Sequence, residues 1–491
     1  MARKPTGVDQ LSEQSRLPVV KSEGVTKSER YLAKLADKSF LNLWSYPSLY
    51  RDQKQSGSGD GKELCDLLVV CGPQIIIFSE KTIAWPNGEL DVAWKRWVKR
   101  AVRDAAKQAK GAERWITEYP ERIFLDRGCK THFPIDFPSP QDRVIHRVVV
   151  VKGAAEACRR YLPNSSGSMI IEPAIKADGH WSSESGEIEP FAIGDVDPAG
   201  SFVHVIDDVA LDIIMRELDT ILDFTDYLNK KEVFVRSGRL YRAHGEENLL
   251  AYYAVRINDD GVHDFVPNSD GNNPVEIDRF LYPNFRRDAR YVARRQADTI
   301  SYLWDELINK FTTHMLNGTS ITPDGYEFDL KKSELGVRYM ALEPRFVRRS
   351  HGEAVRGALE IGVTRSRFFR TIMSSVEAKP NETAFFIHTF KYLNWMERDG
   401  GYKKYRAKRA ECTQVYARGL LEAYPHLTRV VGIALEPPEQ GRGGSQDLVY
   451  AEQCDWTDED RSAIRQACKE YGVLQSGLKR TPVHVTEWPG A

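Results

Sequence analysis

Two apolar runs joined by a four-residue turn constrain the fold of this chain most strongly. Residues 64–81 read LCDLLVV, then CGPQ, then IIIFSEK. Runs this rich in β-branched residues, with a short turn between them, predict a β-hairpin. The first run contains an acid, Asp66, and the second ends on the pair Glu80-Lys81. Charges beside buried strands are costly unless they are paired or bind a metal, so this placement indicates a site.

The segments around the hairpin predict an α/β domain. Thr26 or Ser28 is a suitable N-cap for a helix that precedes the hairpin, and an amphipathic helix with a Trp, Val and Ala stripe covers 90–116. A buried-type strand at 143–153, a short helix and a strand at 167–173 follow. Helices that alternate with strands in this way are typical of α/β (α+β mixed) folds.

A chain of 491 residues is too long for a single hydrophobic core, so several domains are expected. A strand, a long helix and a strand are predicted near 201–236, and a Gly, Asn and Asp-rich break follows at 258–273. Helices are predicted at 285–316 and 403–424. The expected divisions are a flexible arm at 1–25, the first α/β domain at 26–175, a mixed α/β domain at 176–275, and a helical and α/β C-terminal region at 276–491.

The composition shows that the chain as a whole is not basic. Its 69 Lys and Arg face 70 Asp and Glu, a net charge of -1, so nucleic acid would have to meet local basic patches. Seven scattered cysteines form no CxxC pair, which favours free thiols in a reducing cytoplasm. No apolar run approaches the roughly 20 residues that span a bilayer, and the N-terminus lacks the apolar core of a signal peptide. We therefore expect a cytoplasmic protein without membrane association.

The hairpin carries the groups that phosphodiester hydrolysis needs. That reaction requires an activated water, neutralisation of the charge on the phosphate and help for the departing oxygen, and Mg²⁺ held by carboxylates supplies these. Asp66 and Glu80 lie 14 positions apart on the two runs, with Lys81 next. Because these candidate ligands are hard oxygens, we expect Mg²⁺ or Mn²⁺ rather than zinc.

Residues 26–170 resemble the PD-(D/E)XK nuclease superfamily, which has the restriction-endonuclease-like fold. In that family a helix with an acid precedes a hairpin that carries Asp and then Glu or Asp-x-Lys, and a following helix often bears a Gln or a basic residue. The resemblance implies an αβββαβ core. It assigns Asp66 (ELCDLLVV), Glu80 (FSEK) and Glu29 (SERYLAKL) as metal ligands, Asp66, Glu80, Lys81 and Gln108 (AAKQAKGA) as catalytic residues, and Lys107 as a phosphate contact.

One position departs from the family pattern. The acid that the pattern places two residues before the lysine is Ser79 here, and Glu80 is adjacent to Lys81. On a regular strand Ser79 and Lys81 share one face, while Glu80 points to the other. A β-bulge at Ser79-Glu80 would turn Glu80 into the site. Without it, the expected metal ligands are Asp66, a backbone carbonyl and Glu29 or Glu63.

Basic clusters follow residue 280. Charge runs are usually solvated faces, but several of them in a chain of neutral net charge also fit a surface that follows a phosphate backbone. We therefore expect recognition of nucleic acid in the C-terminal half and cleavage in the N-terminal half. The clusters contain Arg286, Arg287, Arg290, Arg294 and Arg295; Arg348 and Arg349; Arg365, Arg367 and Arg370; and Lys403, Lys404, Arg406, Lys408 and Arg409.

Together these features predict a metal-dependent nuclease that acts on DNA in preference to RNA. The resemblance implies bacterial defence against phage or foreign DNA, and a homodimer is a candidate oligomeric state. Two alternatives stay open. A degenerate nuclease fold that binds nucleic acid without cutting it is favoured by Ser79. An interaction or sensor subunit of a larger complex would show no salt-sensitive binding of nucleic acid.

Overall fold

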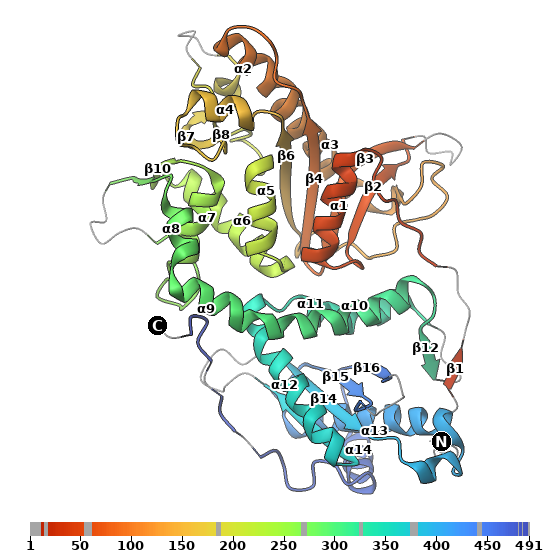
Figure 1. The fold of residues 1–491 in the computed structure, drawn as a ribbon. Coiled ribbons are helices and arrows are strands. Elements are labelled where there is room, and N and C mark those ends of the chain that lie inside the picture. Colours follow the sequence, from red (N-terminus) through yellow and green to blue (C-terminus); the bar gives the residue numbers. More distant parts are fainter. Residues whose placement is uncertain are drawn as a thin grey trace. The chain divides into compact units, whose positions relative to one another are not determined.

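The chain divides after Ala293 into two units, whose elements are labelled in Figure 1. The N-terminal unit spans Val20–Ala293, and the C-terminal unit contains Met1–Val19 and Arg294–Pro489. Both mix helices and strands, which confirms the predicted α/β class. No helix in the described part of the chain is long and apolar enough to cross a membrane. The computed structural model describes residues 11–13, 18–53, 61–182, 188–266, 273–323, 328–373, 382–438, 444–479, 481–483 and 485–489.

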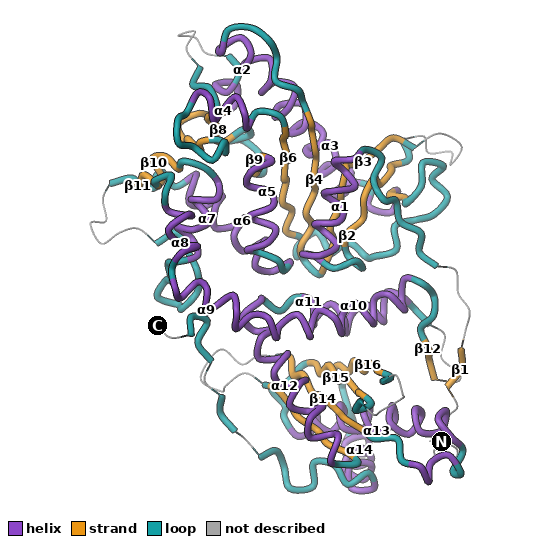
Figure 2. Tube along the Cα trace, viewed as in Figure 1, coloured by secondary structure: helices purple, strands orange, loops and turns teal. Residues whose placement is uncertain are grey.

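A six-stranded sheet forms the centre of the N-terminal unit (Figure 2). Its strands are β2 (Ser45–Arg51), β3 (Lys62–Cys71), β4 (Gln74–Thr82), β5 (Ile123–Phe124), β6 (Val144–Lys152) and β9 (Val203–Asp207). Their order is β5-β2-β3-β4-β6-β9. β2, β3 and β4 are antiparallel neighbours, whereas β6 runs parallel to β4 and β9 parallel to β6. The predicted hairpin is therefore present as β3 and β4.

Helix α1 (Lys27–Phe40) packs on one face of this sheet. Its N-cap is Thr26, whose hydroxyl accepts a hydrogen bond from the backbone N–H of Glu29 at 3.1 Å. Ala36 and Phe40, four residues apart, are both buried. The ring of Phe40 meets Phe78 of β4, with 6.1 Å between the ring centroids. Phe78 therefore marks the face of β4 that α1 covers.

A long helical segment packs on the opposite face. Helix α2 (Leu90–Val98) continues through a π-helical turn, η1 (Lys99–Arg103), into α3 (Asp104–Glu118). Such turns are frequent at functional sites, and this one precedes Gln108 on α3. The predicted apolar stripe belongs to one buried cluster with β6, made of Trp94, Trp97, Val98, Ala101, Val102, Ala105, Val149 and Val151.

The predicted division near residue 175 is not a boundary in the structure. β9 lies in the predicted second domain, yet it pairs with β6 and completes the central sheet. A second sheet of this unit has the order β11-β10-β7-β8. The remaining elements are α4 (Ala155–Tyr161), β7 (Ile170–Lys176), β8 (Ala192–Asp195), α5 (Asp208–Glu217), α6 (Ile221–Arg236), β10 (Leu240–Ala243), α7 (Glu246–Ala254), β11 (Val275–Ile277), α8 (Leu281–Arg287) and α9 (Ala289–Ala297).

The C-terminal unit is built on a four-stranded sheet. Its strands are β13 (Arg367–Ile372), β14 (Thr383–Phe390), β15 (Arg429–Leu435) and β16 (Gln446–Glu452). β14 and β15 are parallel, and β13 and β16 are antiparallel edges. Tyr416 and Leu420 of the longest helix are buried against Phe386 of β14. The helices are α10 (Tyr302–Leu316), α11 (Leu330–Ala341), α12 (Arg345–Thr364), α13 (Gly401–Ala423) and α14 (Asp458–Glu470).

The predicted arm at residues 1–25 is partly described. Leu11–Glu13 forms β1, which is antiparallel to β12 (Ile321–Pro323). Further along, the ammonium of Lys21 donates to the carbonyl of Ser45 at 2.9 Å and lies over the ring of Tyr46. Lys21 is therefore held to the N-terminal unit by side-chain contacts, whereas the backbone N–H of Val19 donates to the carbonyl of Leu316 in the C-terminal unit at 2.7 Å. Residues 1–10 and 14–17 lie outside the described residues.

Candidate active site

Asp66 lies where β3 and β4 stop pairing. The ladder between the two strands ends at Leu67 opposite Phe78, and Asp66 precedes Leu67 on β3. Asp66 is 5% exposed, and its Oδ2 accepts a hydrogen bond from the backbone N–H of Glu80 at 2.6 Å. The buried carboxylate therefore occupies the fork between the two strands.

Alternation along β4 places its last side chains on two faces of the sheet. Phe78 contacts α1, whereas the hydroxyl of Ser79 donates to Oε1 of Gln108 on α3 at 3.1 Å. Lys81 shares the face of Ser79. By the β3–β4 register, Asp66 lies on that face as well. The structure thus brings Asp66, Lys81 and Gln108 to the α3 face of the sheet.

Glu80 points to the α1 face, away from Lys81. Its carboxylate accepts hydrogen bonds from the hydroxyls of Ser28 at 2.9 Å and Thr82 at 2.6 Å, and Nζ of Lys152 lies 3.9 Å away. β4 pairs with β6 one residue for one along its whole length, so the bulge that would turn Glu80 is not formed. The structure therefore does not bring this carboxylate onto the face of Lys81.

The irregularity that turns an acid toward Asp66 occurs on β3 instead. Opposite β2, Leu49 pairs with Cys65 but Tyr50 pairs with Glu63, so β3 carries one extra residue at this point. Residues three apart on a regular strand point to opposite faces. With this extra residue, Glu63 lies on the same face of β3 as Asp66. Bulges next to active sites often reorient a side chain in this way. Of the two arrangements that the sequence left open, the structure has the one without a bulge at Ser79-Glu80, in which Glu63 is a candidate ligand.

Negative charge is in excess at this fork. Burial raises the pKa of Asp66 more than the attraction of Lys81 and the hydrogen bond from Glu80 lower it. Burial also raises the pKa of Glu63 to about 7, with further increases from Asp66 and Glu29. Within the described residues, Lys81 makes no hydrogen bond or ion pair. A bound cation would relieve the repulsion between these carboxylates.

Glu29 contributes charge to the site while its carboxylate is held at the start of α1. That carboxylate accepts hydrogen bonds from the backbone N–H of Val25 at 2.8 Å and from the hydroxyl of Thr26 at 2.9 Å. This is a capping arrangement. Its charge still raises the pKa of both Glu63 and Asp66. The role of Glu29 as a metal ligand stays a prediction.

Two residues of α3 border the same face. Gln108 is half-buried, and its amide nitrogen makes no hydrogen bond to any described residue, so it can donate to a ligand. Lys107 is exposed and has no ion pair in the described part of the chain. Ser79 fixes Gln108 at this face, Lys107 precedes it on α3, and the roles of both residues stay predictions.

The backbone of β2 is strained beside this fork. Ser48 follows Pro47, which pairs with Leu67, so Ser48 stands opposite Asp66. Its φ is 50°, in the left-handed region that a serine rarely adopts. Its hydroxyl is buried and has no hydrogen-bond partner among the described residues. Strain of this kind is often retained at functional sites. No residue type in the sequence marks this strain.

The donor set fits a hard divalent cation that keeps part of its water shell. Nowhere in the described residues do three His, Cys, Asp or Glu side chains gather as ready-made ligands of an ion. Mg²⁺, however, usually binds through one or two carboxylates and completes its shell with waters and substrate phosphates. Asp66 and Glu63, whose charges repel each other, match that mode of binding.

The predicted arginine clusters divide into exposed and structural members. Arg286 and Arg287 at the end of α8 are exposed, and Arg295 is half-buried. Arg290 pairs with Asp288 at 2.7 Å, and Arg294 pairs with Glu487 at 3.2 Å. Arg348, Arg349 and Arg409 are buried in ion pairs with Asp305, Asp298 and Asp447, so their charges are already compensated.

Comparisons of this chain with protein-family models, with curated proteins and with solved structures found no match. Function is therefore inferred from the residues of the site. Of the predicted site residues, Asp66, Lys81 and Gln108 share one face, and Glu80 lies on the other. Glu63 joins Asp66 through the bulge on β3.

Proposed function

We propose that this protein is a metal-dependent nuclease whose active site is the α3 face of β3 and β4. One observation carries the proposal: the buried carboxylate of Asp66 and the unpaired ammonium of Lys81 share this face at the fork between the strands. The elements α1, β2, β3, β4, α3 and β6 follow one another in the order of an αβββαβ core. That order supports membership of the PD-(D/E)XK superfamily, with DNA as the proposed substrate in preference to RNA.

Asp66 and Glu63 are the groups that would hold Mg²⁺ or Mn²⁺. When bound, such a cation neutralises phosphate charge and makes a coordinated water more acidic. The chain supplies two carboxylates whose pKa values are raised by burial. The charge of Asp66 raises the pKa of Glu63 further. The hydrogen bond from the backbone N–H of Glu80 fixes Oδ2 of Asp66, so the orientation of this carboxylate is set before substrate arrives.

Lys81 and Gln108 would act on the phosphate itself. Lys81 presents an ammonium that the described residues leave without an ion pair, which suits it to a non-bridging phosphate oxygen and to the charge that develops there. Gln108 is held by Ser79 through its carbonyl oxygen, and its amide N–H groups are left to orient water or phosphate. Glu80, on the other face, joins β4 to the start of α1 through Ser28 and serves as a positioning residue.

A second candidate is a protein of the same fold that binds nucleic acid without cutting it. Two observations favour it: Ser79 occupies the position of the second acid, and the carboxylate of Glu80 faces away from Lys81. In that protein Asp66 and Lys81 would be a structural charge pair. Exposed cations such as Lys107 would still bind phosphate.

Cleavage and binding measured side by side separate the two candidates. The native protein is incubated with plasmid DNA, single-stranded DNA and RNA in Mg²⁺, in Mn²⁺ and in EDTA. We expect cleavage with either metal and none in EDTA, with DNA cut faster than RNA. Salt-sensitive binding with no cleavage in either metal would support the second candidate and contradict the nuclease. No binding and no cleavage would contradict both and favour an interaction subunit.

A further inference from the structure

The C-terminal unit contains a cavity of about 850 Å³ that the proposed nuclease site does not use. Its walls come from α10, α11, α13 and β16. Small-molecule sites in proteins enclose roughly 300–1,000 Å³, so the volume suits a ligand of that size. The chemistry of the lining residues then decides which ligand the cavity fits.

One stripe of α13 lines the cavity. Arg406, Ala410, Gln414 and Arg418 each follow the previous one by four residues, so they lie above one another on the helix surface. At a rise of 1.5 Å per residue, the two arginines are about 18 Å apart along the helix axis. The small side chain of Ala410 lies between them. The stripe therefore offers a cation at each end of a long, narrow wall.

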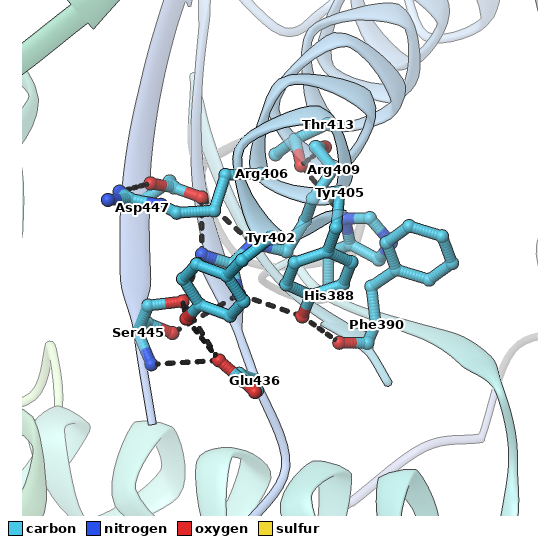
Figure 3. A network of polar contacts seen from close by, with 10 residues as sticks. All are labelled: His388, Phe390, Tyr402, Tyr405, Arg406, Arg409, Thr413, Glu436, Ser445 and Asp447. Atoms are coloured by element: carbon cyan, nitrogen blue, oxygen red, sulfur yellow. Dashed lines mark hydrogen bonds and ion pairs between the residues drawn. The ribbon is translucent and has the colours of Figure 1, made fainter. Parts of the chain in front are cut away.

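The buried guanidinium of Arg409 fixes the adjoining wall on β16 (Figure 3). It donates to Oδ2 of Asp447 at 2.8 Å, to the hydroxyl of Ser445 at 2.9 Å and to the hydroxyl of Tyr405 at 3.1 Å. Arg406 pairs with the same Asp447, and its Nε is buried without a hydrogen bond to any described residue. Two guanidiniums thus share the carboxylate of Asp447, and the carboxylate of Glu436 accepts a hydrogen bond from the hydroxyl of Ser445 at 3.1 Å in the same network.

Two further cations of the lining are not neutralised. The side chains of Lys332 on α11 and Arg418 on α13 are exposed and make no hydrogen bond or ion pair within the described residues. Asp329, the second acid of the lining, is engaged as the N-cap of α11 and accepts a hydrogen bond from the backbone N–H of Lys331 at 2.9 Å. The cavity is therefore suited to an anion.

An apolar surface lies beside these cations. The ring of Tyr450 stacks on that of Tyr339, with 5.7 Å between centroids and 11° between planes, so it is held in one orientation. A ligand that fills this cavity must combine an anionic part with a planar or apolar part. The apolar lining residues include Phe311, Met315, Leu335, Leu448, Val449 and Tyr450.

We propose that this cavity binds a nucleotide, with its phosphates on Arg418 and Lys332 and its base against Phe311 and Tyr450. Guanidinium groups recognise phosphate oxygens through paired N–H donors. Aromatic side chains stack on bases of any sequence. The site lies in the C-terminal unit and does not depend on the proposed nuclease function.

Titration calorimetry of the full chain tests this site with AMP, ATP, the linear dinucleotide pApA and inorganic phosphate as probes. We expect saturable binding of at least one nucleotide, about tenfold or more tighter than inorganic phosphate. Arg418→Ala and Lys332→Ala should each weaken it by about tenfold or more. Lys408→Ala is the matched control, because Lys408 is an exposed cation of α13 that does not line the cavity.

Three results would overturn the proposal. They are the absence of binding by all three nucleotides at millimolar concentration, equal binding by the native chain and the cavity variants, and binding of inorganic phosphate as tight as that of the best nucleotide. Both substituted side chains are exposed, so thermal unfolding of the variants should match that of the native chain. A weakened affinity then reports a lost contact rather than a lost fold.

Discussion

At the scale of single residues, the site is defined by acids whose surroundings oppose their ionisation. Asp66 and Glu63 both have raised pKa values, and burial is the largest cause for each. A structural ion pair would lower such values rather than raise them, since an opposite charge favours the ionised form. Burial therefore outweighs the attraction of Lys81, which lowers both pKa values. Perturbed acids beside an unpaired lysine are a recurring feature of catalytic sites.

Glu63 gives the site a measurable pH dependence. Because folding raises its pKa to about 7 from 4.5, the folded state holds this proton more tightly than the unfolded state does. Its contribution to stability is full below pH 4.5 and is lost as pH rises toward 7. We expect the effect of Glu63→Gln on the free energy of unfolding to be about 1–2 kcal/mol more stabilising at pH 8 than at pH 5. This range allows for partial solvent screening of the carboxylate.

Urea unfolding of the native chain and the Glu63→Gln variant, without divalent cations, measures this difference. Adding Mg²⁺ at pH 8 should reduce it, because a cation that binds the folded state stabilises the ionised carboxylate. A difference that is the same at both pH values would show that Glu63 is not buried beside Asp66.

The alternation of residues along β4 was enough to predict which side chains of this site share a face. Alternation along β4 predicts that Ser79 and Lys81 share a face and that Glu80 does not, and the structure has this arrangement. The face of the sheet on which Glu63 lies could not be predicted in the same way. A bulge is set by the pairing of β3 with β2, which depends on contacts between strands and leaves no mark in the residues around Glu63.

At the scale of elements, the pairing of β4 fixes the face of the sheet on which its one acid, Glu80, lies. Its unbroken register with β6 keeps Glu80 beside Ser28 and Thr82. We expect Glu80→Gln to keep one of these hydrogen bonds through its amide oxygen and to reverse the other, with its amide N–H donating to the second hydroxyl. Single-turnover cleavage by this variant should stay within about threefold of the native rate, and the loss of stability should be below about 1 kcal/mol. A loss of cleavage as large as that of Asp66→Asn would place Glu80 in the active site.

Helical spacing outweighed β propensity in one predicted strand. The end of the segment 201–236 reads EVFVR and was expected to be a strand, yet it forms the last turns of α6. Leu228, Lys231, Phe234 and Val235 are buried at intervals of three and four residues. Nζ of Lys231 donates to Glu246 at 2.5 Å, so the one charge in that stripe is paired. This pairing partner is distant in sequence, which a local pattern does not reveal.

Asp288 interrupts the helix expected at 285–316, and a 3-10 turn at Asp298–Ser301 separates α9 from α10. Asp288 has an extended backbone, with φ of -62° and ψ of 129°, and ends α8. Its carboxylate then accepts a hydrogen bond from the backbone N–H of Arg290 at 2.8 Å, as an N-cap residue does. Aspartate is among the preferred residues for that role. The pattern of the basic run around Asp288 predicts one continuous helix unless the capping role of Asp288 is taken into account.

At the scale of the whole molecule, the boundaries of the units depend on pairing between strands that are far apart in the sequence. The Gly, Asn and Asp-rich break at 258–273 was expected to end a domain, but β11 lies beyond it and pairs in parallel with β10. The break is therefore an insertion within the N-terminal unit. The division falls instead at Ala293, inside the helix α9, where the sequence offers no linker composition.

The N-terminal unit contains its own sheet and core, so it should fold alone. We expect a fragment of residues 18–293 to unfold in urea in one cooperative transition and to keep the metal-dependent cleavage proposed for the full chain. Circular dichroism during urea titration, followed by the cleavage assay, measures both. A fragment without a cooperative transition would show that the core of this unit is incomplete without the rest of the chain.

The exposed arginines of α8 make a testable contribution to binding of nucleic acid. Arg286 and Arg287 are exposed, whereas Arg290 is paired with Asp288. If the first two contact phosphates, Arg286→Ala with Arg287→Ala should reduce the slope of log Kd against log salt by about two. Arg290→Ala should change the slope less. Equal slopes for the native chain and the double variant would remove α8 from the binding surface.

The most direct measurement of the central claim is single-turnover cleavage of DNA in Mg²⁺ by the native chain, Asp66→Asn and Lys81→Ala. Asp66→Asn keeps an oxygen to accept the hydrogen bond from Glu80, so the fold of the fork should persist. Asp91→Asn and Lys38→Ala are matched controls, because both residues are exposed, Asp91 in the first turn of α2 and Lys38 in the last turn of α1. We predict losses of about 100-fold or more for the two site variants and rates within about twofold of native for the controls. Cleavage by Asp66→Asn at the native rate would contradict the assignment of this fork as the active site.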